Sequence, residues 1–295
     1  MLMNHNRQPM IHLSTHSPIV ISTFYHFTRV EDPLALKPAL LARMRELSIH
    51  GTITLAHEGI NATIAGTKEA VDALIAYLRA LPPFSFLQHR ISVDNKIPFG
   101  NCRVKVKREL IGLGAPTDPT SCVGEYIAPK DWNALITRDD VITIDTRNDY
   151  EYQIGHFKGA INPGTRSYNQ MIAFTAATLD PHRHRHVAMY CTGGIRCEKY
   201  SSYLVKMGFE RVYHLRGGIL AYLETIAPAQ SLWQGECYVF DARVAVGHGL
   251  APSTDCTMCF GCGMPLRHAD RQHEAYIPGK QCGGCHEIKA LKRAA

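Results

Sequence analysis

The eleven residues from Met189 to Lys199, Met-Tyr-Cys-Thr-Gly-Gly-Ile-Arg-Cys-Glu-Lys, constrain the fold of this chain more than any other segment. Apolar residues before Cys191 predict a strand over 187–190, and a helix is predicted from about Arg196 to Met207. Cys191 then lies at the carboxyl end of a strand and below a helix N-terminus, which is where ligands bind in open α/β sheets. The segment therefore predicts an α/β domain with a binding loop at Cys191.

The same loop is suited to hold negative charge on sulfur. Gly193 and Gly194 allow backbone N–H groups to converge on the Cys191 sulfur, and Arg196 and the helix dipole add positive potential. These groups lower a thiol pKa, so we expect a thiolate near neutral pH. The alternative is a buried cysteine in a tight turn. Cys197 is either a resolving thiol that forms a disulfide with Cys191 or an ordinary packing residue.

Predicted strands and helices alternate around this loop. The strands are expected at 141–145, 187–190 and 212–214, and the helices at 149–154, at 196–207 and up to about 226. This alternation is typical of an α/β domain with a parallel sheet, which we place at 122–228.

The N-terminal part shows a different order of elements. Its strands are expected at 19–27, 51–56, 62–65 and 90–93, and its helices at 34–47 and 67–81. The order β-α-β-β-α-β predicts a ferredoxin-like (acylphosphatase-like) domain over 18–112. Glycines and prolines in residues 113–123 indicate a linker to the second domain.

A row of basic side chains follows the last of these strands. Arg103, Lys105 and Lys107 share one face of a predicted strand, and Arg108 extends the row. The net charge is +4 for residues 1–121, zero for residues 122–245 and +2 for residues 246–295. A basic excess at both ends suits an acidic partner such as nucleic acid. The alternative is a solvated edge strand whose lysines deter aggregation.

Five of the 10 cysteines crowd the C-terminus. Cys259 and Cys262 form one C-x2-C pair and Cys282 and Cys285 another, a pattern typical of a four-thiolate zinc site. A tail with few large apolar residues gains stability from a metal, so we predict structural zinc in a Cys-rich region over 236–295. Cys256 offers a competing ligand, and an iron–sulfur cluster or uncoordinated thiols are the alternatives.

Other signals exclude several classes of protein. The residues before Ile19 lack the apolar core of a secretory signal, and no run reaches the roughly 18 apolar residues of a membrane span. We therefore expect a cytoplasmic chain with reduced thiols and no membrane partner. The sequence shows no flavin, haem or nucleotide-binding signature and indicates no protein partner.

Residues 124–226 resemble a rhodanese domain. The resemblance rests on the Cys191 loop and on three further segments, at 145–151 (Asp-Thr-Arg-Asn-Asp-Tyr-Glu), 155–163 and 216–219 (Arg-Gly-Gly-Ile). It implies that Cys191 carries a persulfide in a loop of the length associated with sulfur-binding rhodaneses. The catalytic pair is then Cys191 and Arg196, and the anion loop comprises Thr192, Gly193, Gly194 and Ile195. Asp145, Arg147 and Glu151 are expected to be structural, with Arg147 paired to a carboxylate.

The order of all three parts is similar to that of the tRNA uridine(34) hydroxylase family, over about residues 20–290. The segment Ala-His-Glu-Gly-Ile-Asn at 56–61, the rhodanese loop and the C-x2-C tail carry this resemblance. It implies oxidation of C5 of the wobble uridine to 5-hydroxyuridine, with dioxygen as co-substrate.

Together these features lead to one hypothesis about the substrate. The basic row and the tail hold the anticodon arm of tRNA by its phosphates, and the wobble base is extruded toward Cys191. His57 and Glu58 either line the RNA site or cap a turn between two strands. Two rival functions are a thiosulfate-type sulfurtransferase that carries a cysteine persulfide and a non-enzymatic zinc-dependent RNA-binding protein.

Overall fold

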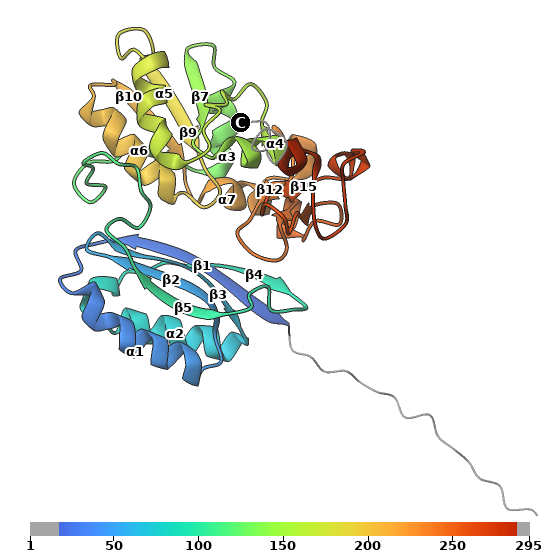
Figure 1. The fold of residues 1–295 in the computed structure, drawn as a ribbon. Helices are drawn as coiled ribbons and strands as arrows, with labels where there is room; N and C mark the ends of the chain where they lie inside the picture. Colours follow the sequence, from blue (N-terminus) through green and yellow to red (C-terminus); the bar gives the residue numbers. More distant parts are fainter. Residues whose placement is uncertain (1–17, 288–295) are drawn as a thin grey trace, which may run out of the picture.

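The computed structural model describes residues 18–287 of the 295-residue chain. An N-terminal sheet with two helices lies below a parallel sheet surrounded by helices, and the C-terminal segment packs beside the parallel sheet (Figure 1). Residues 288–295, which we included in the Cys-rich region, lie outside the described part. Within residues 18–287, no helix combines the length and apolar character needed to cross a membrane.

The N-terminal part has the predicted ferredoxin-like order of elements, with one strand added. Its elements are β1 (Ile19–Phe27), α1 (Pro33–Glu46), β2 (His50–Ala56), β3 (Gly59–Gly66), α2 (Lys68–Arg79), β4 (Arg90–Asp94) and β5 (Cys102–Val106). The sheet order is β4-β1-β3-β2-β5, and β5, which carries Arg103 and Lys105 of the basic row, pairs parallel to β2 at the edge. Thr67 accepts a hydrogen bond from the Ala70 amide and caps α2, as its sequence predicts.

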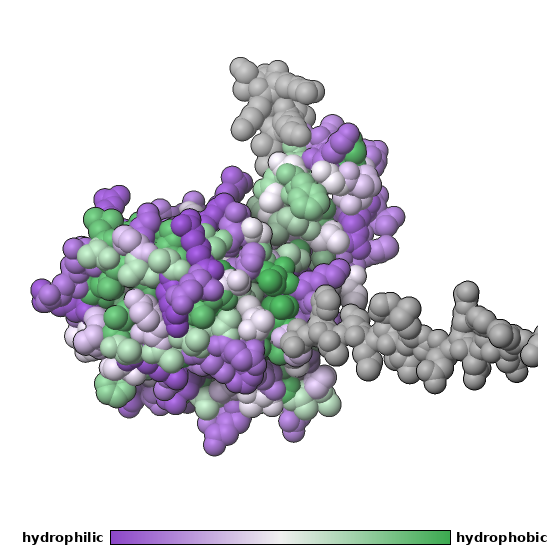
Figure 2. Space-filling model, turned by 90° about the horizontal axis from the view of Figure 1, so that it is seen from below, coloured by the Kyte–Doolittle hydropathy of each residue, from purple (hydrophilic) through white to green (hydrophobic). Residues whose placement is uncertain are grey.

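The two faces of this sheet differ in polarity because side chains alternate along each strand. Apolar residues such as Phe24, Ile53 and Ile64 pack against α1 and α2. Viewed from the helix side, the surface mixes hydrophilic and hydrophobic residues (Figure 2). The opposite face carries polar residues of β1, β3 and β2, namely Thr23, Tyr25, Asn61, Thr63, Thr52 and Thr54. This polar face is turned toward the second part of the chain (Figure 1).

The second part contains a four-stranded parallel sheet in the order β6-β10-β9-β7, as expected for a rhodanese domain. Its strands are β6 (Glu125–Ile127), β7 (Val141–Asp145), β9 (His186–Tyr190) and β10 (Arg211–Leu215). Its helices are α3 (Pro129–Ile136), α4 (Asp149–Ile154), α5 (Met171–Thr178), α6 (Ile195–Lys206) and α7 (Gly218–Thr225). Residues of α3 and α7 share one core cluster and residues of α5 and α6 another, so helices cover both faces of the sheet.

The C-terminal segment is joined to the rhodanese domain by a short strand pair. β8 (Gly155–Phe157) pairs antiparallel to β11 (Trp233–Gly235), and the rings of Phe157 and Trp233 lie 5.1 Å apart. Two small hairpins follow, formed by β12 (Cys237–Tyr238) with β13 (Ala245–Val246) and by β14 (Thr257–Met258) with β15 (Pro265–Leu266). The tail therefore packs on α4 and β8 through these short elements.

Candidate active site

The Cys191 loop connects β9 to α6, as its sequence predicts. Cys191 is 1% exposed, and the Gly194 N–H donates a hydrogen bond to its Sγ at 3.1 Å. Gly194 has a φ of 106°, a conformation that L side chains rarely adopt. This glycine therefore allows the backbone to turn its amide toward the sulfur.

The two cysteines of the loop differ in their ionisation. Burial raises the pKa of the Cys191 thiol. Hydrogen bonds from the Cys197 thiol and from the amides of Cys197 and Gly194, together with the charge of Arg196, outweigh this effect and lower the pKa to about 6. Burial and the nearby Cys191 raise the pKa of Cys197 well above its ordinary value. At neutral pH Cys191 is therefore the thiolate, and Cys197 keeps its proton.

Arg196 is fixed in the loop by an ion pair with a buried carboxylate. Its Nη1 and Nη2 atoms each lie 2.7 Å from a carboxylate oxygen of Glu151 on α4, and Glu151 is fully buried. Nη2 also donates to the Thr192 hydroxyl at 3.4 Å. Arg147 forms the second buried pair, with Asp145 at 2.6 Å, as expected for a structural arginine.

The N-terminus of α7 supports the loop from below. The amides of Ile219 and Leu220 donate to the carbonyl oxygens of Cys191 and Thr192 at 3.0 and 3.1 Å. A Cβ atom on Gly218 would lie 2.5 Å from both of these oxygens, and the φ of Gly218 is 65°. Only glycine fits between α7 and the loop.

Replacing Gly218 by alanine is expected to lower the stability of the rhodanese domain by more than about 3 kcal/mol, because the backbone clash adds to left-handed strain. The expected fall in Tm is at least about 6 °C. Gly208→Ala is the matched control, since Gly208 also has a positive φ but an added Cβ meets no atom within 4 Å. Equal melting temperatures for the two variants would contradict this account.

The N-terminal domain contacts the Cys191 loop and the adjoining Glu198 carboxylate of α6. The Tyr25 hydroxyl, on the polar face of β1, donates to Glu198 Oε1 at 2.8 Å, and the Tyr126 hydroxyl of β6 donates to Oε2 at 2.7 Å. A Cβ atom on Gly194 would lie 2.7 Å from the Tyr25 hydroxyl. Tyr25 therefore lies directly against the Cys191 loop.

The next residue of α6 makes a second contact between the domains. Lys199 is 1% exposed, and its Nζ lies 3.1 Å from both carboxylate oxygens of Glu58 and 2.5 Å from Glu109. Glu58 belongs to the turn between β2 and β3 and also accepts the Leu110 amide at 2.6 Å. An open pocket of about 410 Å³ adjoins this cluster and is lined by Glu58, Glu109, Lys199 and residues 114–117. His57, in contrast, is exposed and interacts with the Val30 carbonyl.

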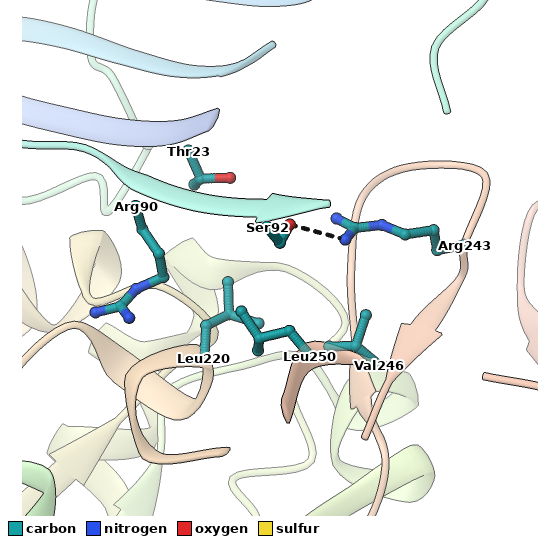
Figure 3. A pocket seen from close by; sticks show the side chains of 7 residues that line it. All are labelled: Thr23, Arg90, Ser92, Leu220, Arg243, Val246 and Leu250. Carbon is teal, nitrogen blue, oxygen red and sulfur yellow. Dashed lines mark hydrogen bonds between the residues drawn. The ribbon is translucent and has the colours of Figure 1, made fainter. Parts of the chain in front are cut away.

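A third contact joins the N-terminal sheet to the C-terminal segment. Arg243 donates to the Ser92 hydroxyl of β4 at 3.0 Å and pairs with Asp241, while Leu220 of α7 and Leu250 lie beneath (Figure 3). Three parts of the chain therefore meet around the small pocket that Figure 3 shows.

The basic row lies on the same face of the sheet as Tyr25 but at the far edge. Arg103 and Lys105 are exposed and lie opposite Thr52 and Thr54 of β2. Three inter-strand steps separate β5 from β1, or about 14 Å at the usual strand spacing. Lys107 and Arg108 continue the exposed row beyond β5.

The four predicted metal ligands come together in the C-terminal segment. The sulfur atoms of Cys259, Cys262, Cys282 and Cys285 all lie within 4.8 Å of one another. The distance is 4.0 Å between Cys259 and Cys285 and 3.6 Å between Cys262 and Cys282, close to the roughly 3.8 Å of a tetrahedral zinc–thiolate site. This cluster therefore fits a metal ion such as zinc.

Cys256 does not belong to this cluster. It packs with Ile154, Tyr238 and Val244, and its amide donates to the Ser253 hydroxyl at 2.8 Å. Burial and the nearby Glu236 raise the pKa of Cys256 to about 12. The first C-x2-C pair of the cluster is Cys259 with Cys262.

Sequence reasoning missed Tyr25, Tyr126, Glu198 and Lys199 as neighbours of the loop. Glu198 and Lys199 lie in the quoted loop segment, yet a charged pair at the start of a helix is ordinary. Their partners are 173 and 141 residues away, so only the packing of the domains brings them together.

The chain combines a parallel sheet that carries this cysteine loop with a ferredoxin-like sheet whose Tyr25 contacts the loop. This architecture is that of a two-domain rhodanese protein. Two family models agree with it, since "UPF0176 acylphosphatase like domain" matches residues 19–110 and "Rhodanese-like domain" matches residues 128–225.

Two curated relatives identify the family more closely, and both are called tRNA uridine(34) hydroxylase. The protein of Picosynechococcus sp. is 50% identical over 275 residues, covering 93% of this chain and 92% of that protein. The protein of Teredinibacter turnerae is 46% identical over 272 residues, covering 92% of this chain and 84% of that protein. The chain belongs to the tRNA uridine(34) hydroxylase family.

Proposed function

We propose that this chain hydroxylates C5 of the wobble uridine of tRNA, with dioxygen as co-substrate, and releases 5-hydroxyuridine at position 34. The observation that carries the proposal is 46–50% identity to hydroxylases over more than nine tenths of the chain. The loop geometry supports it, because the fold holds one ionised sulfur, Cys191, against the N-terminal domain.

Cys191 is the reactive group of this proposal, as a thiolate or a persulfide. The Gly194 amide stabilises its charge, the segment 192–195 shapes the anion loop, and Arg196 holds that loop through Glu151. Cys197 keeps its proton in the same buried site, and its proposed role is that of a resolving thiol for Cys191. A pure sulfurtransferase needs only the rhodanese domain, whereas Tyr25 and Glu58 of the N-terminal domain contact α6 here.

The anticodon arm is proposed to bind at the exposed basic edge of the N-terminal sheet. Arg103, Lys105, Lys107 and Arg108 contact its phosphates, and the threonine and asparagine side chains of β1 to β3 lie between this basic edge and Tyr25. Phosphate contacts position an RNA without reading its sequence. An enzyme that acts on a base takes it out of the stack, so the flipped uridine reaches the Cys191 loop at Tyr25.

Zinc is the proposed occupant of the four-cysteine cluster. Cys259, Cys262, Cys282 and Cys285 provide four thiolates, a ligand set typical of a closed structural zinc site. The bound ion stabilises a segment whose own core comprises little more than Cys259, Cys282, Cys285, Leu266 and Tyr276. Its role is structural, with the tail packed on α4 through the bond from Arg267 to the Gln153 carbonyl at 3.0 Å.

Mass spectrometry of nucleosides tests the proposed function. A strain without this gene is expected to lack 5-hydroxyuridine at position 34, and the wild-type gene is expected to restore it in the presence of dioxygen. Unchanged 5-hydroxyuridine in the deletion strain would contradict the hydroxylase function.

A further inference from the structure

Glu198 is a buried carboxylate without a cationic partner among residues 18–287. It is 4% exposed, and its two oxygens accept the hydroxyl groups of Tyr25 and Tyr126. Within residues 18–287 it takes part in no ion pair, unlike Glu151, which binds Arg196 through both oxygens. A buried charge without a partner is costly, so such a group calls for an explanation.

The carboxylate adjoins the reactive sulfur through a short series of contacts. The Gly194 N–H donates to the Cys191 sulfur, and the Tyr25 hydroxyl lies against Gly194 and donates to Glu198. The Glu198 amide donates to the Gly194 carbonyl at 3.2 Å. Gly194 therefore connects the loop that carries Cys191 to the first turn of α6 that carries Glu198, with the Tyr25 hydroxyl beside it.

The cations around this pair are engaged elsewhere or lie outside it. Arg196 of the loop is bound to Glu151, and Lys199 of α6 is bound to Glu58 and Glu109. Arg216, after β10, lies over the ring of Tyr126 at 5.4 Å and is exposed. The polar groups bonded to the Glu198 side chain are thus Tyr25 from β1 and Tyr126 from β6, and the Cys191 sulfur lies on the other side of the contact between Tyr25 and Gly194.

We propose that Glu198 is a positioning residue whose negative charge, held close to the Cys191 loop, sets how readily the Cys191 sulfur ionises, and that Tyr25 gives the N-terminal domain control over this charge. The inference deepens the proposed function because it concerns the same cysteine. A negative charge near a thiol opposes formation of the thiolate, so a charged Glu198 raises the pKa of a neighbouring sulfur. Burial raises the pKa of Glu198, the tyrosine hydroxyls lower it and the charge of Cys191 raises it again.

Removing the carboxylate should make the sulfur easier to ionise. In Glu198→Gln no negative charge opposes the thiolate, so the pKa of Cys191 falls. In Tyr25→Phe or Tyr126→Phe the carboxylate loses a hydrogen bond that stabilises its charged form. Glu198 then keeps its own proton up to a higher pH, and the pKa of Cys191 falls by a smaller amount.

The experiment measures alkylation of Cys191 by iodoacetamide in the full-length protein, followed by peptide mass spectrometry between pH 4.5 and 9. The midpoint of the plot of alkylation rate against pH gives the pKa of Cys191. A change in the access of the reagent to the sulfur alters the height of this plot but not its midpoint. For Glu198→Gln we expect a midpoint at least half a pH unit lower, which is about a threefold higher thiolate fraction below the midpoint. Glu210→Gln is the matched control, because Glu210 pairs with Arg185 on the surface.

An unchanged or higher midpoint in folded Glu198→Gln would overturn the proposal. If that variant does not fold, the midpoints of Tyr126→Phe and Tyr25→Phe test the proposal. Tyr152→Phe is their control, because the Tyr152 hydroxyl donates to the Ala160 carbonyl and not to Glu198. No shift in either variant would also overturn it. The assay contains no tRNA, so its failure leaves the nucleoside test of the proposed function unaffected.

Discussion

Replacing Cys191 by alanine is expected to abolish 5-hydroxyuridine formation while the protein stays folded. The thiolate is the group on which the whole loop converges, through the Gly194 amide, the Arg196 charge and the protonated Cys197. Removal of a nucleophile of this kind typically lowers the rate by a factor of about a thousand or more. The loss of one sulfur atom from the core should lower the unfolding free energy by only about 1 kcal/mol.

The measurement compares the 5-hydroxyuridine content of tRNA with the Tm of each purified variant. Cys237→Ala is the matched control, because Cys237 is also fully buried in the same region but burial raises its thiol pKa to about 12. We expect full product with Cys237→Ala and none with Cys191→Ala. Product at wild-type levels with Cys191→Ala would exclude a chemical role for this sulfur and favour the RNA-binding alternative.

Removal of the metal is the second change with a large expected effect. Cys282→Ala leaves three thiolates, so zinc content should fall from about one equivalent to below a tenth. Structural zinc contributes about 10 kcal/mol or more to the folding of small zinc-finger peptides, so the segment around the cluster should unfold locally. Metal analysis and hydrogen exchange of residues 256–287 measure both effects.

Cys256→Ala provides the control for this experiment. Cys256 lies in the same segment but packs with Tyr238 and Val244, so its replacement should leave the zinc content unchanged. Zinc loss in both variants would show that the ligand set differs from the one proposed. Less than half an equivalent of zinc in the wild-type protein would count against a four-thiolate zinc site.

The elements with a strong local pattern were predicted well. The first strand, β1, begins and ends where the sequence indicates, and α2 starts at its Thr67 cap. The short strands β6, β8 and β11 were not predicted, since each has three residues and exists only through pairing with a distant partner. The turn at His57 is also shorter than expected, because β3 already begins at Gly59 and extends the hairpin.

The sequence by itself determined the two domain folds, the cysteine loop and which four cysteines of the C-terminal segment cluster together. Each of these depends on residues close together in the chain, as with the glycines that turn an amide toward Cys191 or the two C-x2-C pairs. Only the tertiary structure decided what surrounds the sulfur. Tyr25 and Glu58 reach α6 from 173 and 141 residues away, and Arg196, whose charge lowers the pKa of Cys191 as expected, is held in place by the buried Glu151. The physical reason is that a local pattern specifies backbone conformation and burial, whereas the partner of a charged side chain is chosen by how the packed domains meet.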